Sequence, residues 1–149
     1  VFPDASVVFT HRDPVSIVAS LATMIAYGAR LSDERIDLER YGIYWRDRVK
    51  DLLNACVRDR DKVPGAQSMD IRFQDFVGQD MDRVRDIYAL AEQPLPEASV
   101  ASMAAYAAAN PQGVNGKVIY RLEDFGLEAN ELREDFREYT DRFEVRFER

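Results

Sequence analysis

The residues best suited to chemistry stand near the start of the chain, around Arg12. The apolar run at 6–10 predicts a short buried strand, Asp13 is placed as the N-cap of a following helix, and Pro14 as its first residue. A strand that turns directly into a helix leaves backbone N–H groups at the positive end of the helix dipole, where phosphate or sulfate binds favourably. The pattern therefore predicts an anion-binding site at this turn.

Side chains near the turn strengthen this prediction. The guanidinium of Arg12 is a forked cation that can hold an anion through two hydrogen bonds. Ser16 and Ser20 are four residues apart, so they share one face of the helix and add hydroxyl donors. An alternative without any ligand is a local salt bridge in which Asp13 holds Arg12. His11 is the only histidine, and a structural role at the strand end is favoured over a catalytic base, since no nucleophile is placed beside it.

The pattern Arg-Asp-Pro-x-Ser-x-x-x-Ser at 12–20, preceded by Phe-Pro-Asp-Ala at 2–5, resembles the 3′-phosphate-binding segment of the sulfotransferases that use 3′-phosphoadenosine-5′-phosphosulfate (PAPS). In that family an arginine at the strand end and a serine eight residues later hold the 3′-phosphate. Carried over by position, these residues are Arg12 and Ser20. Segments 71–76 and 110–127 are similar to later parts of the family and follow in the same order, so the resemblance spans nearly the whole chain.

The chain departs from the family pattern in three places. It contains no loop of the Lys/Arg-Ser-Gly-Thr type that wraps the 5′-phosphosulfate, and Phe73 stands where the family has a tyrosine. Val114 and Asn115 occupy positions where basic and histidine residues are expected, which leaves Lys117 as the nearest candidate phosphate contact. The resemblance implies that residues 1–149 form a single domain, the C-terminal portion of a sulfotransferase-like domain.

The function implied by the resemblance is sulfuryl transfer from PAPS, the nucleotide co-substrate, to a hydroxyl or amine of a small-molecule acceptor, with no metal. Arg12 and Ser20 would anchor the nucleotide, Ser16 and Lys117 would assist, and the catalytic base is not assigned. We expect the isolated chain to be inactive because the 5′-phosphosulfate loop is absent. Two alternatives stay open: a non-catalytic interaction module derived from this fold, and a fragment of a nucleoside or small-molecule kinase.

The composition excludes several classes of protein. The chain has 149 residues, long enough for a sizeable core, and its 20 basic and 27 acidic residues give a net charge of −7, which argues against bulk nucleic-acid binding. No apolar stretch approaches the length of a membrane span. Cys56 is the only cysteine, so an internal disulfide and a cysteine-based metal cluster are excluded. A cytoplasmic location is the corresponding expectation.

Periodicity predicts helices over 14–27, closed by Gly28, and over 32–60, 81–91 and 97–109. In the second of these helices an apolar stripe is expected to be buried, and its aromatic residues are assigned to core packing in preference to a pocket for the acceptor. The stripe consists of Leu38, Tyr41, Trp45, Val49, Leu52 and Cys56. The aromatic residues in question are Tyr41, Tyr44 and Trp45.

Near the C-terminus, Leu132, Phe136, Tyr139 and Phe143 predict one amphipathic helix. Residues 144–149 are expected to be an edge strand or a frayed helix end. A second strand is expected at 68–73, parallel to the first because two helices separate them. The predicted fold is α/β, a partial P-loop-like sulfotransferase fold with few parallel strands flanked mostly by helices. Since parallel sheets are normally larger, we expect residues outside this chain, a partner chain or a second copy to complete the sheet.

Overall fold

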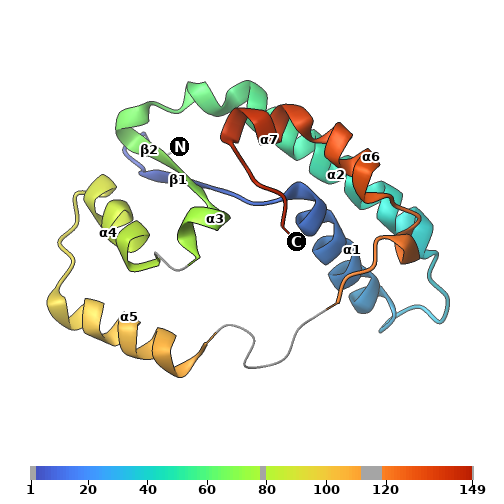
Figure 1. Ribbon diagram of the computed structural model, residues 1–149, viewed down its shortest axis with the longest axis horizontal. Coiled ribbons are helices and arrows are strands. Elements are labelled where there is room, and N and C mark those ends of the chain that lie inside the picture. Colours follow the sequence, from blue (N-terminus) through green and yellow to red (C-terminus); the bar gives the residue numbers. More distant parts are fainter. Residues whose placement is uncertain (1–2, 78–79, 112–118, 149) are drawn as a thin grey trace. The chain divides into compact units, whose positions relative to one another are not determined.

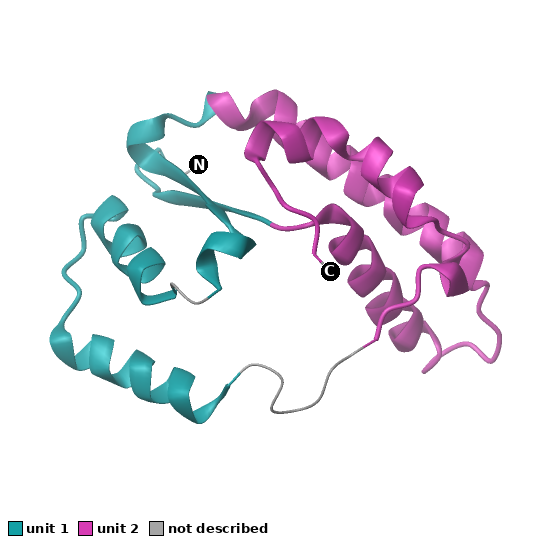
Figure 2. Ribbon diagram, in the orientation of Figure 1, with its two compact units in different colours: residues 1–11, 62–118 teal, residues 12–61, 119–149 magenta. Residues whose placement is uncertain are grey.

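The computed structural model describes residues 3–77, 80–111 and 119–148. The chain divides into two compact units, coloured separately in Figure 2. Unit 1 contains residues 1–11 and 62–118, and unit 2 contains residues 12–61 and 119–149. Each unit is therefore built around its own set of helices, and unit 2 is assembled from two segments that are distant in the sequence.

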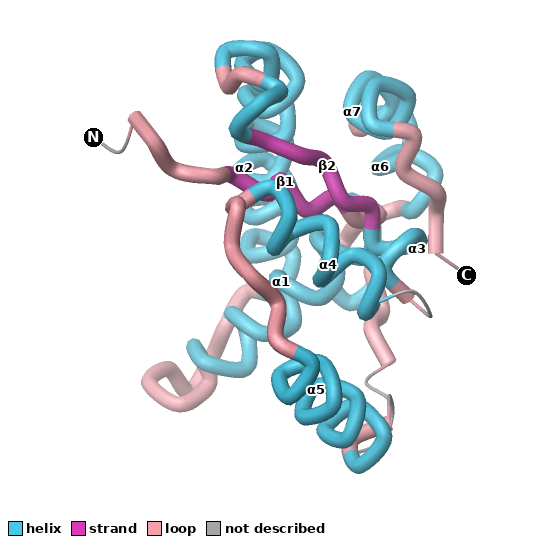
Figure 3. The backbone as a smooth tube through the Cα atoms, turned by 90° about the vertical axis from the view of Figure 1, so that its left-hand side faces the viewer, coloured by secondary structure: helices cyan, strands magenta, loops and turns pink. Residues whose placement is uncertain are grey.

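Unit 1 contains the sheet of the described residues, formed by β1 (Val7–His11) and β2 (Ser68–Arg72). The two strands are parallel, as predicted, with Val7 opposite Ser68 and His11 opposite Arg72 (Figure 3). β1 is shifted by one residue at both ends, from the predicted 6–10 to Val7–His11, and β2 stops one residue early, at Arg72. The α/β fold class is confirmed.

Helices fill the rest of unit 1. A short 3-10 turn, η2 (Gly65–Gln67), leads into β2, and α3 (Phe73–Phe76) follows the strand directly. Next come α4 (Asp80–Leu90) and α5 (Glu97–Ala109). The bounds of α5 are those that the sequence predicts, because Pro96 precedes the helix and Asn110-Pro111 ends it.

Unit 2 is helical. It contains α1 (Pro14–Ala29), α2 (Leu38–Asp59), the 3-10 turn η3 (Glu123–Phe125), α6 (Ala129–Asp135) and α7 (Arg137–Phe143); the 3-10 turn η1 (Arg60–Lys62) follows α2. α1 packs against α2 and α6, while α2 also contacts α7 and η3 (Figure 1). These elements enclose a core of Val18, Ala22, Ala26, Val49, Leu53, Phe125, Leu127, Leu132, Phe136, Tyr139 and Val145.

Two predicted helix ends were wrong by two residues or more. α1 does not stop at Gly28 but runs through it to Ala29. α2 begins at Leu38, six residues after the predicted start at Ser32, because Asp37 is the N-cap and its carboxylate accepts a hydrogen bond from the backbone N–H of Arg40. The sequence offers both Asp33 and Asp37 as caps, and only the second is followed by the helix.

The buried stripe of α2 is also shifted. Val49 is buried as predicted, but Leu52 is 67% exposed and its neighbour Leu53 faces the core instead. The buried residues of α2 are Gly42, Val49 and Leu53, spaced by seven and four. An apolar pair such as Leu52-Leu53 fits the helical period with either member inside, so periodicity alone could not decide between them.

The predicted C-terminal helix is two short helices. α6 and α7 meet at Phe136, whose backbone (φ −104°, ψ 10°) is not helical. The predicted burial is nevertheless confirmed for Leu132, Phe136 and Tyr139, which are at most 2% exposed, while Phe143 is only partly buried. After α7, residues 144–148 form neither of the two structures predicted for them but an irregular tail.

Candidate functional site

The predicted anion site lies where β1 gives way to α1. We call it the Arg12 corner and define it by Arg12, Ser16, Ser20, Tyr120 and Glu148, all of which belong to unit 2. The helix begins as predicted, with Asp13 as N-cap and Pro14 as the first residue. This start fixes the direction in which the hydroxyls of the first two turns of α1 project.

The N-cap residue Asp13 accepts hydrogen bonds from two of the groups that were expected to bind an anion. The carboxylate of Asp13 accepts hydrogen bonds from the backbone N–H of Val15 (2.9 Å) and from the Ser16 hydroxyl (3.2 Å), and Asp13 is only 3% exposed. Pro14 has no N–H, and the N–H of Val15 donates to Asp13, so these two residues leave no backbone donor for an anion. An anion bound here would have to be held mainly by side chains.

Arg12 already holds an anion, the carboxylate of Glu148. Arg12 Nε donates to Glu148 Oε1 (2.6 Å) and Nη2 donates to Oε2 (2.7 Å), a two-pronged pair. The alternative of a local salt bridge between Asp13 and Arg12 is thus not the pair formed, although the negative charge of Asp13 also raises the pKa of Arg12. Arg12 and Glu148 side chains are 43% and 31% exposed, so the corner is open to solvent.

The pair shifts the pKa of both partners. Hydrogen bonding to Glu148 is the largest cause of the raised pKa of Arg12, against partial burial. Hydrogen bonding from Arg12 is likewise the largest cause of the lowered pKa of Glu148, and the Ser16 hydroxyl lowers it further. The Ser16 hydroxyl therefore lies within reach of two carboxylates, those of Asp13 and Glu148.

The main chain of the tail is held as well. The backbone N–H of Glu148 donates to Asp13 Oδ2 at 2.8 Å. Asp13 therefore links the start of α1 to a residue 135 positions later in the chain. With the bonds from Val15 and Ser16, this contact gives the buried Asp13 side chain three hydrogen-bond donors.

Ser20 lies one turn of α1 beyond Ser16 and contacts a different residue. Its hydroxyl donates to Tyr120 Oη at 3.3 Å. Tyr120 is also near enough to Arg12 to contribute to the raised pKa of the guanidinium. The corner thus brings together one guanidinium and the hydroxyls of Ser16, Ser20 and Tyr120.

Glu148 and Tyr120 belong to the Arg12 corner but were not predicted from the sequence. Tyr120 falls within segment 110–127, whose resemblance to the family was noted. Glu148 gave no signal, since its partner is 136 residues away in the chain. Lys117, Val114 and Asn115 lie outside the described residues.

His11 plays a structural role. Its side chain is 2% exposed at the end of β1, and Nε2 is 2.7 Å from Asp70 Oδ1 on β2. This contact joins the two strands of the sheet within unit 1. His11 therefore has the structural role at the end of a strand that the sequence predicts.

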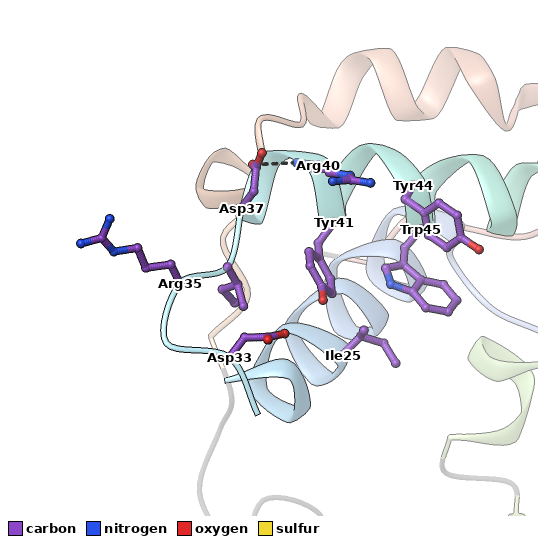
Figure 4. A pocket seen from close by; sticks show the side chains of 9 residues that line it. Ile25, Asp33, Arg35, Asp37, Arg40, Tyr41, Tyr44 and Trp45 are labelled. Atoms are coloured by element: carbon purple, nitrogen blue, oxygen red, sulfur yellow. Dashed lines mark hydrogen bonds between the residues drawn. The ribbon is translucent and has the colours of Figure 1, made fainter. Parts of the chain in front are cut away.

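A pocket of about 610 Å³ lies beside the N-terminal half of α2. Figure 4 shows Tyr41 and Trp45 projecting from α2 toward Ile25 of α1, with the Asp33 carboxylate nearby and Arg35 pointing away. Tyr44 is 54% exposed and packs edge-on against Trp45, with ring centroids 5.3 Å apart. The three aromatic residues were assigned to core packing, and the structure instead places them around this pocket. The complete lining is Ile25, Asp33, Arg35, Ile36, Asp37, Arg40, Tyr41, Tyr44 and Trp45.

In the part of the chain that the structure describes, no group of three or more His, Cys, Asp or Glu side chains is placed so that it could hold a metal ion. No described helix has both the length and the apolar character needed to cross a membrane.

Comparison with known proteins identifies the fold. A model of the sulfotransferase family matches residues 1–97. The crystal structure of sulfotransferase STF9 from Mycobacterium avium superposes with a TM-score of 0.85 at 28% identity, covering 99% of this chain but 38% of that one. The chain therefore spans well under half the length of that structure. No curated protein matches the chain. With its α/β fold matching a solved sulfotransferase and a family model covering most of its length, the chain belongs to the sulfotransferase family.

Proposed function

We propose that this chain carries the 3′-phosphate-binding half of a PAPS-dependent sulfotransferase. PAPS would supply the sulfuryl group, which passes to a hydroxyl or amine of a small-molecule acceptor while the acceptor loses a proton. The proposal is supported by membership of the family and by the position of Arg12 and Ser20, eight residues apart at the start of α1. The base that takes the proton is not assigned to any residue of this chain.

The observation that carries the proposal is the two-pronged grip of Arg12 on a carboxylate. A guanidinium edge that fits two carboxylate oxygens also fits two phosphate oxygens, because both anions present oxygen pairs at similar spacing. The corner is therefore chemically suited to a phosphate monoester. Arg12 would contribute charge and direction to the 3′-phosphate.

The hydroxyls have matching roles. Ser16 would donate to a phosphate oxygen beside Arg12, and Ser20 would do so one turn further along the helix, with Tyr120 extending the donor set. Lys117 would add a second cation, a role that rests on the family resemblance. These donors suit an anion and include no ligand set for a metal.

For the acceptor we propose the aromatic pocket beside α2. Its walls are mainly aromatic and aliphatic, and its volume lies within the range of small-molecule sites. Two aspartates and two arginines in the lining balance each other in charge. A neutral, planar alcohol fits such a site, since the rings stack on it and a polar side chain meets its hydroxyl.

The proposal is tested by titrating the chain with adenosine 3′,5′-bisphosphate and following the melting temperature. Binding should raise the melting temperature, and Arg12→Ala should remove most of the rise because the phosphate loses its only guanidinium partner in the proposed set. A nucleotide without a 3′-phosphate, such as ATP, should have little effect.

Arg137→Ala is the matched control for this experiment. Arg137 is an exposed arginine of unit 2 that pairs with Glu134. Its replacement by alanine removes one positive charge outside the Arg12 corner. Its variant should respond to the nucleotide as the unmodified chain does. A chain that ignores adenosine 3′,5′-bisphosphate and purifies with a stoichiometric partner would instead favour the non-catalytic interaction module.

A further inference from the structure

The tail, residues 144–148, returns from the end of α7 to the beginning of α1 (Figure 1). Glu144 adopts a left-handed backbone (φ 52°) that reverses the chain after the helix. Val145 is then buried in the core of unit 2, and its N–H donates to the carbonyl of Thr140 at 3.0 Å. The path that brings Glu148 to the Arg12 corner is thus fixed by packing and backbone hydrogen bonding.

At the corner, Glu148 interacts with two of the donors that the proposed function assigns to the nucleotide, Arg12 and Ser16. Both edge nitrogens of Arg12 point at its carboxylate, and the Ser16 hydroxyl also contributes. One edge of a guanidinium has two parallel N–H bonds to offer, so it cannot hold a carboxylate and a phosphate in this way together.

We propose that Glu148 is an internal competitor of the nucleotide, and that the 3′-phosphate binds by displacing the Glu148 side chain from Arg12. The inference rests on the proposed function of the corner. It adds a self-inhibitory contact, in which the chain covers its own phosphate-binding donors while no nucleotide is present.

Charge decides the direction of the exchange. A phosphate monoester carries about −1.5 to −2 charges near neutral pH and has three strong acceptor oxygens, whereas the carboxylate carries one charge and two oxygens. Asp13 already places a second carboxylate beside Ser16. Keeping Glu148 in place while phosphate enters would crowd three anions together, so release of Glu148 lowers the repulsion.

The competition has a measurable consequence. A ligand whose site is open for only a fraction of the time binds with an affinity reduced by that fraction. Removing the Glu148 carboxylate should therefore tighten the binding of adenosine 3′,5′-bisphosphate, by about 1.5- to 5-fold for a solvent-open ion pair. A purely structural Glu148 would give the opposite result, because its loss would loosen the corner.

The experiment is calorimetric titration of adenosine 3′,5′-bisphosphate into the full 149-residue chain, its Glu148→Gln variant and its Glu148→Asp variant. We expect Gln to bind more tightly than the unmodified chain, since its neutral amide competes poorly. Asp keeps the charge but is shorter by one methylene, so its variant should fall between the two.

Glu134→Gln is the matched control, because it removes one negative charge from an exposed pair elsewhere in unit 2. Its affinity should equal that of the unmodified chain. Equal or weaker binding by Glu148→Gln, with binding by the unmodified chain intact, would overturn the competition and leave the proposed function standing. If neither the unmodified chain nor Glu148→Gln bound the nucleotide, both proposals would be overturned.

Discussion

At the scale of single residues, Arg12 lies near the beginning of the sequence and pairs with Glu148, which lies 136 residues later. The guanidinium and Glu148 shift each other's pKa in the directions that favour the charged pair. Both side chains are about a third or more exposed, so solvent screens the pair and its contribution to stability is about 0.2–1 kcal/mol.

The lowered pKa of Glu148 predicts a pH dependence. A carboxyl whose pKa is lower in the folded chain adds stability that is fully present above its usual value, 4.5, and is lost as the pH falls through the folded value. Melting temperatures of the unmodified chain and Glu148→Gln should therefore differ at neutral pH and converge in acid. If the difference between the two melting temperatures stayed constant down to about pH 3, the charge of Glu148 would not be what stabilises the corner.

The residues of the corner differ in how far sequence could predict them. Arg12, Asp13 and Pro14 follow from the local rules for a strand that ends at a helix, and the structure shows that cap. Glu148 could not be found in this way, because its contact with Arg12 exists only after the tail has packed into unit 2. A charge pair between distant segments produces no repeating spacing of residues by which the sequence could reveal it.

At the scale of elements, the close contact between α2 and the segment at η3 depends on Gly42. A Cβ added there would lie 2.4 Å from the carbonyl oxygen of Phe125 and 2.7 Å from its Cβ. Neither atom is the far end of a flexible side chain, so the two elements would have to separate. Gly42 is therefore required for packing and not for its backbone conformation.

Gly42→Ala should destabilise unit 2 by about 1–3 kcal/mol, the usual cost of overpacking a core. Gly28→Ala provides the control, because a Cβ at Gly28 meets nothing within 4 Å and alanine is the better helix former by about 1 kcal/mol. Chemical denaturation of the three chains measures both effects. If Gly42→Ala proved as stable as Gly28→Ala, the tight contact with Phe125 would be refuted.

The bounds of an element were predicted correctly where residues that interrupt a helix flank it on both sides. Helix 97–109 is bracketed by prolines, and the structure has those bounds. It failed where the sequence offers two equivalent choices: Asp33 or Asp37 as the cap of α2, and Leu52 or Leu53 as its buried leucine. Tertiary contacts make those choices, and the break at Phe136 between α6 and α7 has the same origin, since the apolar spacing continues across it.

At the scale of the molecule, unit 2 contains both the Arg12 corner and the aromatic pocket. α1 contributes to both, with Ser16 and Ser20 in its first half and Ile25 in its second half. The net charge of −7 disfavours the approach of an anion, so the proposed nucleotide would have to be held by the local donors of the Arg12 corner.

Trp45 makes the pocket observable, because it is the only tryptophan of the chain. A neutral phenolic alcohol such as a naphthol should quench or shift its emission on binding, after correction for the absorbance of the probe. The effect should persist in Arg12→Ala, since Arg12 is not in the lining of the pocket. Emission that stays unchanged up to millimolar probe would rule out the pocket as a site for such an acceptor.

The division of unit 2 into two sequence segments has a consequence for synthesis on the ribosome. Helices α1 and α2 emerge first, but Phe125, Leu127, Leu132, Phe136, Tyr139 and Val145 of their core are translated only after all of unit 1. Until then the apolar faces of α1 and α2 can pack only on each other, and the apolar surface left uncovered favours aggregation or capture by chaperones. The β1–β2 pair can consequently form before the core of unit 2 is complete.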